Sequence, residues 1–183
     1  MKRTLCLATI SLCANAYAAE ASDVSCISSF CLSAAIEDKT VVDIYGPGLR
    51  LPLPKPSAEY MRCYYLSDED AWAELYFDAD KGRLVAMIVT RARHCAENQQ
   101  PKRPMAADFL QGRIRLGMRE NALPLLLGKP SQIIPTNATN DHAPLIDVKL
   151  GDVVQTYMAS EDWCYLVYLK DGLVVGFGMM PPL

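Results

Sequence analysis

The sequence predicts an α+β fold of two tandem repeats, each made of short helices plus an antiparallel β-meander, in two layers with one curved sheet. The first observation behind this prediction is an internal repeat, because the same order of helix, strand and turn signals runs from about residue 34 to 89 and again from about 116 to 179. The second is the alternation of apolar and polar residues in the strand segments, which is typical of a sheet with one buried face.

Each repeat opens with a short amphipathic helix that ends at a glycine and a proline. The first helix is expected over residues 35–45, before Gly46, and the second over 117–127, before Gly128. A glycine after the last helical turn, followed by a proline that cannot continue the helix, is a usual stop signal. Superposing Gly46 on Gly128 places Val41 on Leu123, so both helices present the same apolar face.

Strand segments and tight turns follow each helix. Glycine allows the positive φ that a tight hairpin turn requires, and Lys81-Gly82 and Asp171-Gly172 therefore predict hairpins. The expected strands are 63–66, 71–77 and 84–89 in the first repeat and 155–158, 163–169 and 173–178 in the second.

The N-terminus has the pattern of a secretory signal. Lys2 and Arg3 precede an apolar stretch of about 12 residues, and Ala16-Tyr17-Ala18 gives a cleavage site after Ala18. This stretch is too short to cross a bilayer, which needs roughly 20 residues. We expect a periplasmic or secreted protein without a membrane span, divided into a signal peptide (1–18), repeat 1 (19–95), a linker (96–105) and repeat 2 (106–183).

Lipoprotein processing is the competing interpretation of the N-terminus, because Cys13 lies near the end of the apolar stretch. That processing requires a small residue before the cysteine, whereas Leu12 is large. The sequence therefore favours simple cleavage.

Five cysteines follow the predicted signal, and in an oxidising compartment disulfides are expected. An odd number leaves one thiol outside two pairs, and Cys164, inside an expected strand, is the candidate for a buried thiol. The spacing does not decide how the others pair: Cys26 and Cys31 could close a small loop or reach separate partners. The disulfide candidates are Cys26, Cys31, Cys63 and Cys95.

The charge balance excludes two classes of partner. The chain has 18 Lys and Arg against 21 Asp and Glu, a net charge of −3, and loss of Lys2 and Arg3 with the signal makes it more negative. A protein that binds nucleic acid needs a basic patch to displace counterions. Attachment to anionic lipid also needs basic clusters, so neither interaction is expected.

The segment from Leu116-Gly117-Met118 to Leu126-Leu127-Gly128-Lys129-Pro130 resembles the Gly-Met…Leu-Gly-x-Pro signature of the SmpA/OmlA-type envelope lipoproteins. That family shares its helix-helix-meander unit with the β-lactamase inhibitory protein (BLIP). The resemblance implies a BLIP-like fold, in which two units stand in tandem and their strands form one sheet with a concave outer face. Pro124 departs from the signature, and the missing lipoprotein cleavage motif favours the soluble inhibitor branch over an anchored role.

No catalytic constellation is visible in the sequence. His94 and His142 lack Cys, Asp or Glu at ligand spacing, and no nucleophile-elbow, Walker or dinucleotide-binding motif occurs. The acidic run 68–70 does not have the spacing of a calcium loop, so we interpret it as a solvated hairpin tip. We therefore expect no enzyme, no catalytic residue, no metal and no cofactor.

Strand alternation points to a binding face instead. If Ala73, Leu75 and Phe77 pack on the helices, the intervening residues point to the opposite side, which a two-layer fold leaves open. Aromatic residues beside an arginine on such a face are typical of protein-binding hot spots, whereas the competing interpretation is that they cover a second core. The candidate partner-binding residues are Arg62, Tyr64, Trp72, Glu74, Tyr76, Leu166 and Tyr168.

These observations lead to a hypothesis of protein binding. We expect a secreted or periplasmic inhibitor or immunity-type protein that acts through the open sheet face, with a hydrolase or a toxin as its partner. The alternative is an envelope assembly or structural factor of the SmpA/OmlA type, associated with an outer-membrane complex. A carrier of small ligands is a third possibility, supported only by the number of aromatic residues.

Overall fold

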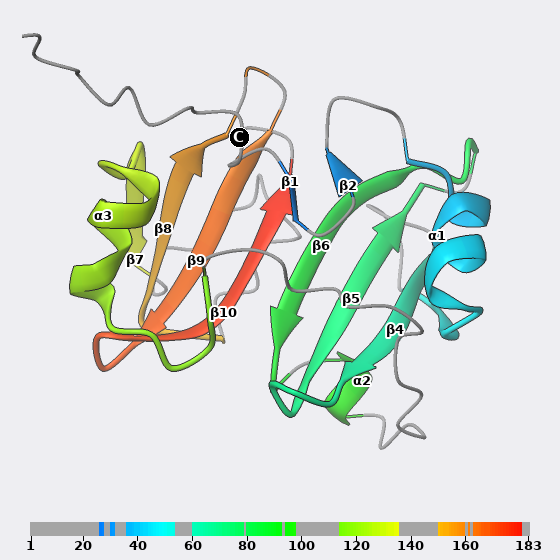
Figure 1. The fold of residues 1–183 in the computed structure, drawn as a ribbon, viewed down its shortest axis with the longest axis horizontal. Coiled ribbons are helices and arrows are strands. Elements are labelled where there is room, and N and C mark those ends of the chain that lie inside the picture. The colour runs from blue at the N-terminus through cyan, green and yellow to red at the C-terminus, as the bar shows by residue number, and fades with distance from the viewer. Residues whose placement is uncertain are drawn as a thin grey trace, which may run out of the picture.

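The computed structural model of the chain describes residues 26–27, 30–31, 36–53, 60–78, 80–92, 94–97, 114–135, 150–159, 161 and 163–180 (Figure 1). The predicted signal peptide and residues 98–105 of the predicted linker lie outside these ranges. The signal peptide and the repeat boundaries stay predictions.

One eight-stranded antiparallel sheet dominates the described part of the chain, and its order is β3-β4-β5-β6-β10-β9-β8-β7. Strands β3 to β6 form one half of this sheet, strands β7 to β10 form the other, and β6 and β10 meet in the middle (Figure 1). The strand bounds are β3 Leu49–Pro52, β4 Tyr60–Leu66, β5 Ala71–Phe77, β6 Leu84–Thr90, β7 Gln132–Pro135, β8 Val153–Met158, β9 Cys164–Lys170 and β10 Leu173–Met180.

The helices are short, and two of them lie at the ends of the sheet. Helix α1 (Asp38–Tyr45) lies at the β3–β4 end, and α3 (Leu123–Leu127), which follows a 3₁₀ turn at Glu120–Ala122, lies at the β7–β8 end (Figure 1). Helix α2 (His94–Glu97) is a single turn. Within the described ranges, two further strands, β1 (Cys26–Ile27) and β2 (Phe30–Cys31), pair with each other and with no other strand.

The prediction of an α+β fold with tandem helices is therefore wrong: the chain has a mostly-β fold. The reason lies just before each helix, where Glu37 and Arg119 are extended because the sheet holds their backbone. The N–H of Leu84 donates to the Ile36 carbonyl at 2.8 Å, and that of Val174 donates to the Met118 carbonyl at 2.8 Å. Each helix consequently begins late, and Pro124, tolerated in the first turn of α3, keeps that helix short.

Both faces of the sheet carry buried side chains. We call the side on which Val41 of α1 and Leu123 of α3 pack the α1/α3 face, and the opposite side, on which Cys95 of α2 packs, the α2 face. Because partners in an antiparallel pair point to the same side, the strand registers assign each residue to a face. Ala73, Leu75 and Phe77 lie on the α1/α3 face, as the sequence predicts.

The central pair of strands approaches closely at Gly178. Gly178 pairs with Ile88 across the seam between β10 and β6, and a Cβ atom at this position would collide with the Met87 carbonyl oxygen. A strand interior without a side chain is unusual and often marks close backbone approach. The glycine therefore permits the contact that joins the two halves.

The disulfide Cys63–Cys95 ties α2 to β4, with a Cα–Cα distance of 5.8 Å and both residues fully buried. Cys164 is a buried thiol outside the disulfides, as the sequence predicts. The Cα atoms of Cys26 and Cys31 are partners in the β1–β2 pair, but their side chains lie outside the described residues, so this part of the cysteine prediction stays open.

Replacing Cys63 and Cys95 by serine is expected to lower the free energy of unfolding by roughly 3–4 kcal/mol, because the cross-link closes a loop of 32 residues in the unfolded chain. Urea denaturation measures the loss. The matched control is Cys164→Ala, which removes a buried sulfur but no cross-link. A loss no larger than that of the control would contradict the assigned role.

Candidate functional site

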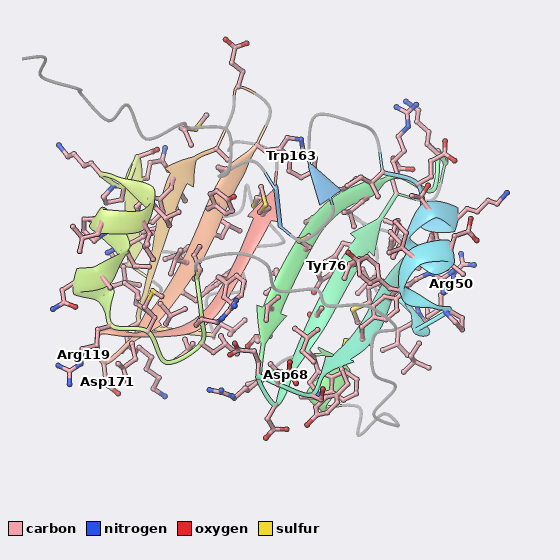
Figure 2. All side chains as sticks on the ribbon, in the orientation of Figure 1. Arg50, Asp68, Tyr76, Arg119, Trp163 and Asp171 are labelled. Atoms are coloured by element: carbon pink, nitrogen blue, oxygen red, sulfur yellow. A yellow bond between two sulfur atoms is a disulfide. The ribbon has the colours of Figure 1, made fainter. Side chains whose placement is uncertain are left out.

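The structure brings five of the seven predicted partner-binding residues onto the α2 face. Trp72, Glu74 and Tyr76 lie on β5, and Leu166 and Tyr168 lie on β9, where Tyr76 and Tyr168 occupy corresponding positions of the two halves. Figure 2 shows Tyr76 near the middle of the first half.

Arg62 and Tyr64 lie on the other side of the sheet, and their predicted placement beside Trp72 is wrong. The turn between β4 and β5 has four residues, so Leu66 pairs with Ala71, and Tyr64 pairs with Ala73 on the α1/α3 face. The cross-strand partner of Trp72, on the same face, is Tyr65. Its ring packs edge-on against the indole, with 5.4 Å between the ring centres. Counting the residues of the turn would have identified it.

The α2 face is not open at the predicted positions. Trp72 is 7 % exposed, and Glu74, Tyr76, Leu166 and Tyr168 are each 1 % exposed or less. Side chains that pack on this face include Cys95 of α2, Ile134 of β7 and Leu150. The competing interpretation, that these aromatics cover a second core, agrees with this burial. Their role in partner binding stays a prediction.

Glu74 is a fully buried carboxylate with a structural role. One carboxylate oxygen accepts a hydrogen bond from the Tyr76 hydroxyl at 2.6 Å, and the other accepts from the backbone N–H of Cys95 at 2.9 Å. A buried carboxylate requires such donors, because leaving it unsolvated is costly. Together with the disulfide, Glu74 fixes the start of α2 on the sheet.

Arg62 holds α1 against the sheet at both ends of the helix. Its guanidinium forms a bidentate ion pair with Asp38 in the first helical turn, with one contact at 2.7 Å, and donates to the carbonyl of Pro47, just after the helix, at 2.5 Å. Tyr64 adds a hydrogen bond from its hydroxyl to the Gly46 carbonyl at 2.8 Å. Burial alone would raise the pKa of Asp38, but the hydrogen bond and the charge of Arg62 outweigh it and lower that pKa below 3.8.

This ion pair predicts a dependence of stability on acid. The folded pKa of Asp38 lies below its unfolded value of 3.8, so the contribution is complete above pH 3.8 and is lost as the pH falls through the folded pKa. Asp38→Asn should remove this acid-dependent part of the unfolding free energy, measured by urea titration between about pH 6 and pH 3. The control is Asp43→Asn, an exposed carboxylate on the same helix. An unchanged acid dependence in Asp38→Asn would rule out the assignment.

The acidic hairpin tip between β4 and β5 is engaged in protein contacts. Glu69 lies 3.4 Å from the Arg115 guanidinium, its carbonyl accepts from Arg91 at 2.9 Å, and Asp70 accepts from the Tyr65 hydroxyl. In the described part of the chain no three His, Cys, Asp or Glu side chains are grouped to hold a metal ion. His94 begins α2, and His142 lies outside the described residues.

A shallow pocket of about 500 Å³ lies where the segment before α3 meets the turn between β9 and β10. Figure 2 shows Arg119 and Asp171 close together there. Its lining residues are Arg119, Glu120, Asn121, Asp171, Gly172 and Leu173. No sequence motif indicates this pocket, and its mixed charges do not select one class of ligand.

Exposed apolar side chains concentrate in the second half of the sheet. Among the described residues the large exposed apolar side chains are Ile44, Leu125, Ile133, Met158 and Leu173. Leu125 on α3 is 87 % exposed, and Ile133 on β7 is 59 % exposed. Both belong to the α1/α3 side at the β7 end, and we call this pair the β7-end surface.

The first half provides an internal reference for the β7-end surface. Asp43 and Leu125 each lie three residues before the glycine that ends their helix. Arg50 and Ile133 also correspond, because each is the outermost member of an equivalent row of cross-strand partners. The rows are Arg50, Arg62, Leu75 and Met87 in the first half, and Ile133, Gln155, Val167 and Phe177 in the second. The fold therefore accepts charged residues where the second half exposes leucine and isoleucine.

The helix attachment is also repeated, in a less charged form. Gln155 donates from its side-chain amide to the Glu120 carboxylate at 2.6 Å, as Arg62 does to Asp38 in the first half. The two halves thus share their construction and differ in what they expose.

Comparisons with known proteins do not identify the chain. No family model matches it, and no curated protein is similar in sequence. A DUF4309 family protein (YjgB) from Bacillus subtilis has a distantly similar structure, with 8 % identity, a TM-score of 0.46, and coverage of 82 % of this chain and 80 % of that chain. This likeness is too distant to support an inference about function, and the SmpA/OmlA and BLIP resemblance stays a prediction. No described helix is long and apolar enough to cross a membrane.

Proposed function

We propose that this chain is a secreted or periplasmic protein-binding module, of the inhibitor or immunity type, which binds its partner through the β7-end surface. The observation that carries the proposal is the exposure of Leu125 and Ile133 where the equivalent positions of the first half are Asp43 and Arg50. Singly exposed apolar residues are common on protein surfaces, so the proposal depends on the contrast between the two halves at these positions.

The compartment is part of the proposal. Disulfides persist in oxidising environments, and Cys63–Cys95 is consistent with passage through such a compartment. A partner that meets the chain there is itself an envelope or secreted protein. We place the contact at the β7 end instead of the α2 face, because Trp72, Glu74 and Tyr76 are buried.

Leu125→Asp copies the residue of the first half and should leave the fold intact while weakening partner binding at least tenfold, which corresponds to about 1.4 kcal/mol. The measurement is affinity capture from an envelope extract, with the wild-type chain and the variant run in parallel and circular dichroism as the check on folding. Ile44→Asp, which alters a 39 % exposed apolar residue on α1, is the matched control.

A soluble hydrolase or toxin retained by the wild-type chain and by Ile44→Asp, but lost by Leu125→Asp, would support the proposal. Equal capture by Leu125→Asp would contradict the surface assignment. Retention of membrane complexes alone would contradict the inhibitor type and favour a role in envelope assembly.

A further inference from the structure

The eight-stranded sheet ends in two edge strands of similar construction. In the described part of the chain, no strand pairs with the outer side of β3 or of β7. Each has four residues and ends in a proline, Pro52 or Pro135. Because an edge strand presents unpaired N–H and C=O groups, what distinguishes the two edges is their side chains.

The β3 edge is protected by charge. Arg50 is exposed, and its guanidinium lies 3.8 Å from the centre of the Tyr60 ring. Tyr60 in turn stacks on Phe77, with 5.3 Å between ring centres. This stacking holds a positive charge at the edge, and a charge there disfavours pairing with a further strand.

The β7 edge lacks this protection. Its sequence is Gln-Ile-Ile-Pro, with no charged residue, and Ile133 takes the place that Arg50 has in the first half. Leu125, at the same end of the sheet, adds a second exposed apolar side chain. Among the described residues, therefore, the two edges differ in charge: the β3 edge carries an exposed arginine and the β7 edge carries an exposed isoleucine.

The size of the surface bears on what binds there. A stable dimer buries roughly 800 Å² on each partner, far more than two aliphatic side chains provide. An extended segment that adds a strand to a sheet gains affinity from main-chain hydrogen bonds and needs only a few side-chain contacts. The small apolar area that Leu125 and Ile133 offer therefore favours a single extended segment over a second copy of this chain.

We propose that β7 is an acceptor edge: an extended segment of the partner protein pairs with β7 as an additional strand and packs apolar side chains on Ile133 and Leu125. This inference rests on the proposed function and names the kind of partner segment that the surface recognises. The specificity comes from alternate apolar residues, since only one side of the added strand faces Ile133.

The test uses a labelled, end-blocked peptide of alternating valine and threonine flanked by lysines, titrated onto the full chain and followed by fluorescence anisotropy. Ile133→Arg, which copies the guarded edge, should weaken binding at least tenfold. Arg50→Ile, which opens the other edge, should raise the stoichiometry from one peptide to two. Amide hydrogen exchange of the wild-type complex should show new protection within residues 132–135.

Failure of the peptide to bind, unchanged affinity in Ile133→Arg, or protection confined to other strands would overturn the inference. A concentration-dependent dimer that Ile133→Arg abolishes would also overturn it, in favour of a second copy of this chain. The proposed function is tested separately. If Leu125→Asp no longer captures the partner, but the β7 amides stay unprotected in the complex of the wild-type chain with that partner, then partner binding stands and strand addition fails.

Discussion

The antiparallel pairing of β6 with β10 is the contact on which the molecule depends, because it makes one sheet from two four-stranded meanders. A single sheet needs this backbone ladder at its centre, and Gly178 allows the two strands to approach. The pairing also leaves β3 and β7, the outermost strands of the two halves, at opposite edges of the sheet. The seam therefore decides where the exposed edges lie.

Each half attaches its helix to the sheet in the same manner. Ile36 and Met118 accept equivalent hydrogen bonds from the sheet, and Asp38 and Glu120 are held by Arg62 and Gln155. Because these internal contacts are repeated, a difference between the halves at an exposed position is not required by the fold. Two such differences exist: the second half exposes Leu125 and Ile133 where the first half has Asp43 and Arg50. The functional proposal depends on them.

The sequence predicts the local structure better than the surface. Helix ends at Gly46 and Gly128, the buried pair Val41 and Leu123, and the turn at Asp171-Gly172 follow from local rules and agree with the structure. Local rules overestimate the helical content, because the hydrogen bonds that the sheet makes to Ile36 and Met118 are long-range interactions.

The sequence misplaces two residues of the predicted binding face, and misses the burial of the others, for related reasons. The side on which Arg62 and Tyr64 lie depends on the length of the turn between β4 and β5, because a change of one residue shifts every partner of β4. The burial of Glu74 depends on α2, because Cys95, 21 residues further along the chain, packs over it. The β7-end surface could not be inferred from periodicity, since leucine on a short helix is ordinarily buried. The structure shows that Leu125 is exposed, whereas its correspondence with Asp43 follows from the sequence once Gly46 is superposed on Gly128.

The most direct test of this account is the equilibrium unfolding of the double variant Leu125→Asp/Ile133→Arg, which gives the second half the surface residues of the first. We expect a free energy of unfolding within about 0.5 kcal/mol of the wild-type value, as for surface substitutions away from structural contacts. A loss of about 2 kcal/mol or more would show that these apolar side chains hold the fold together, and would remove the reason for assigning them to a partner.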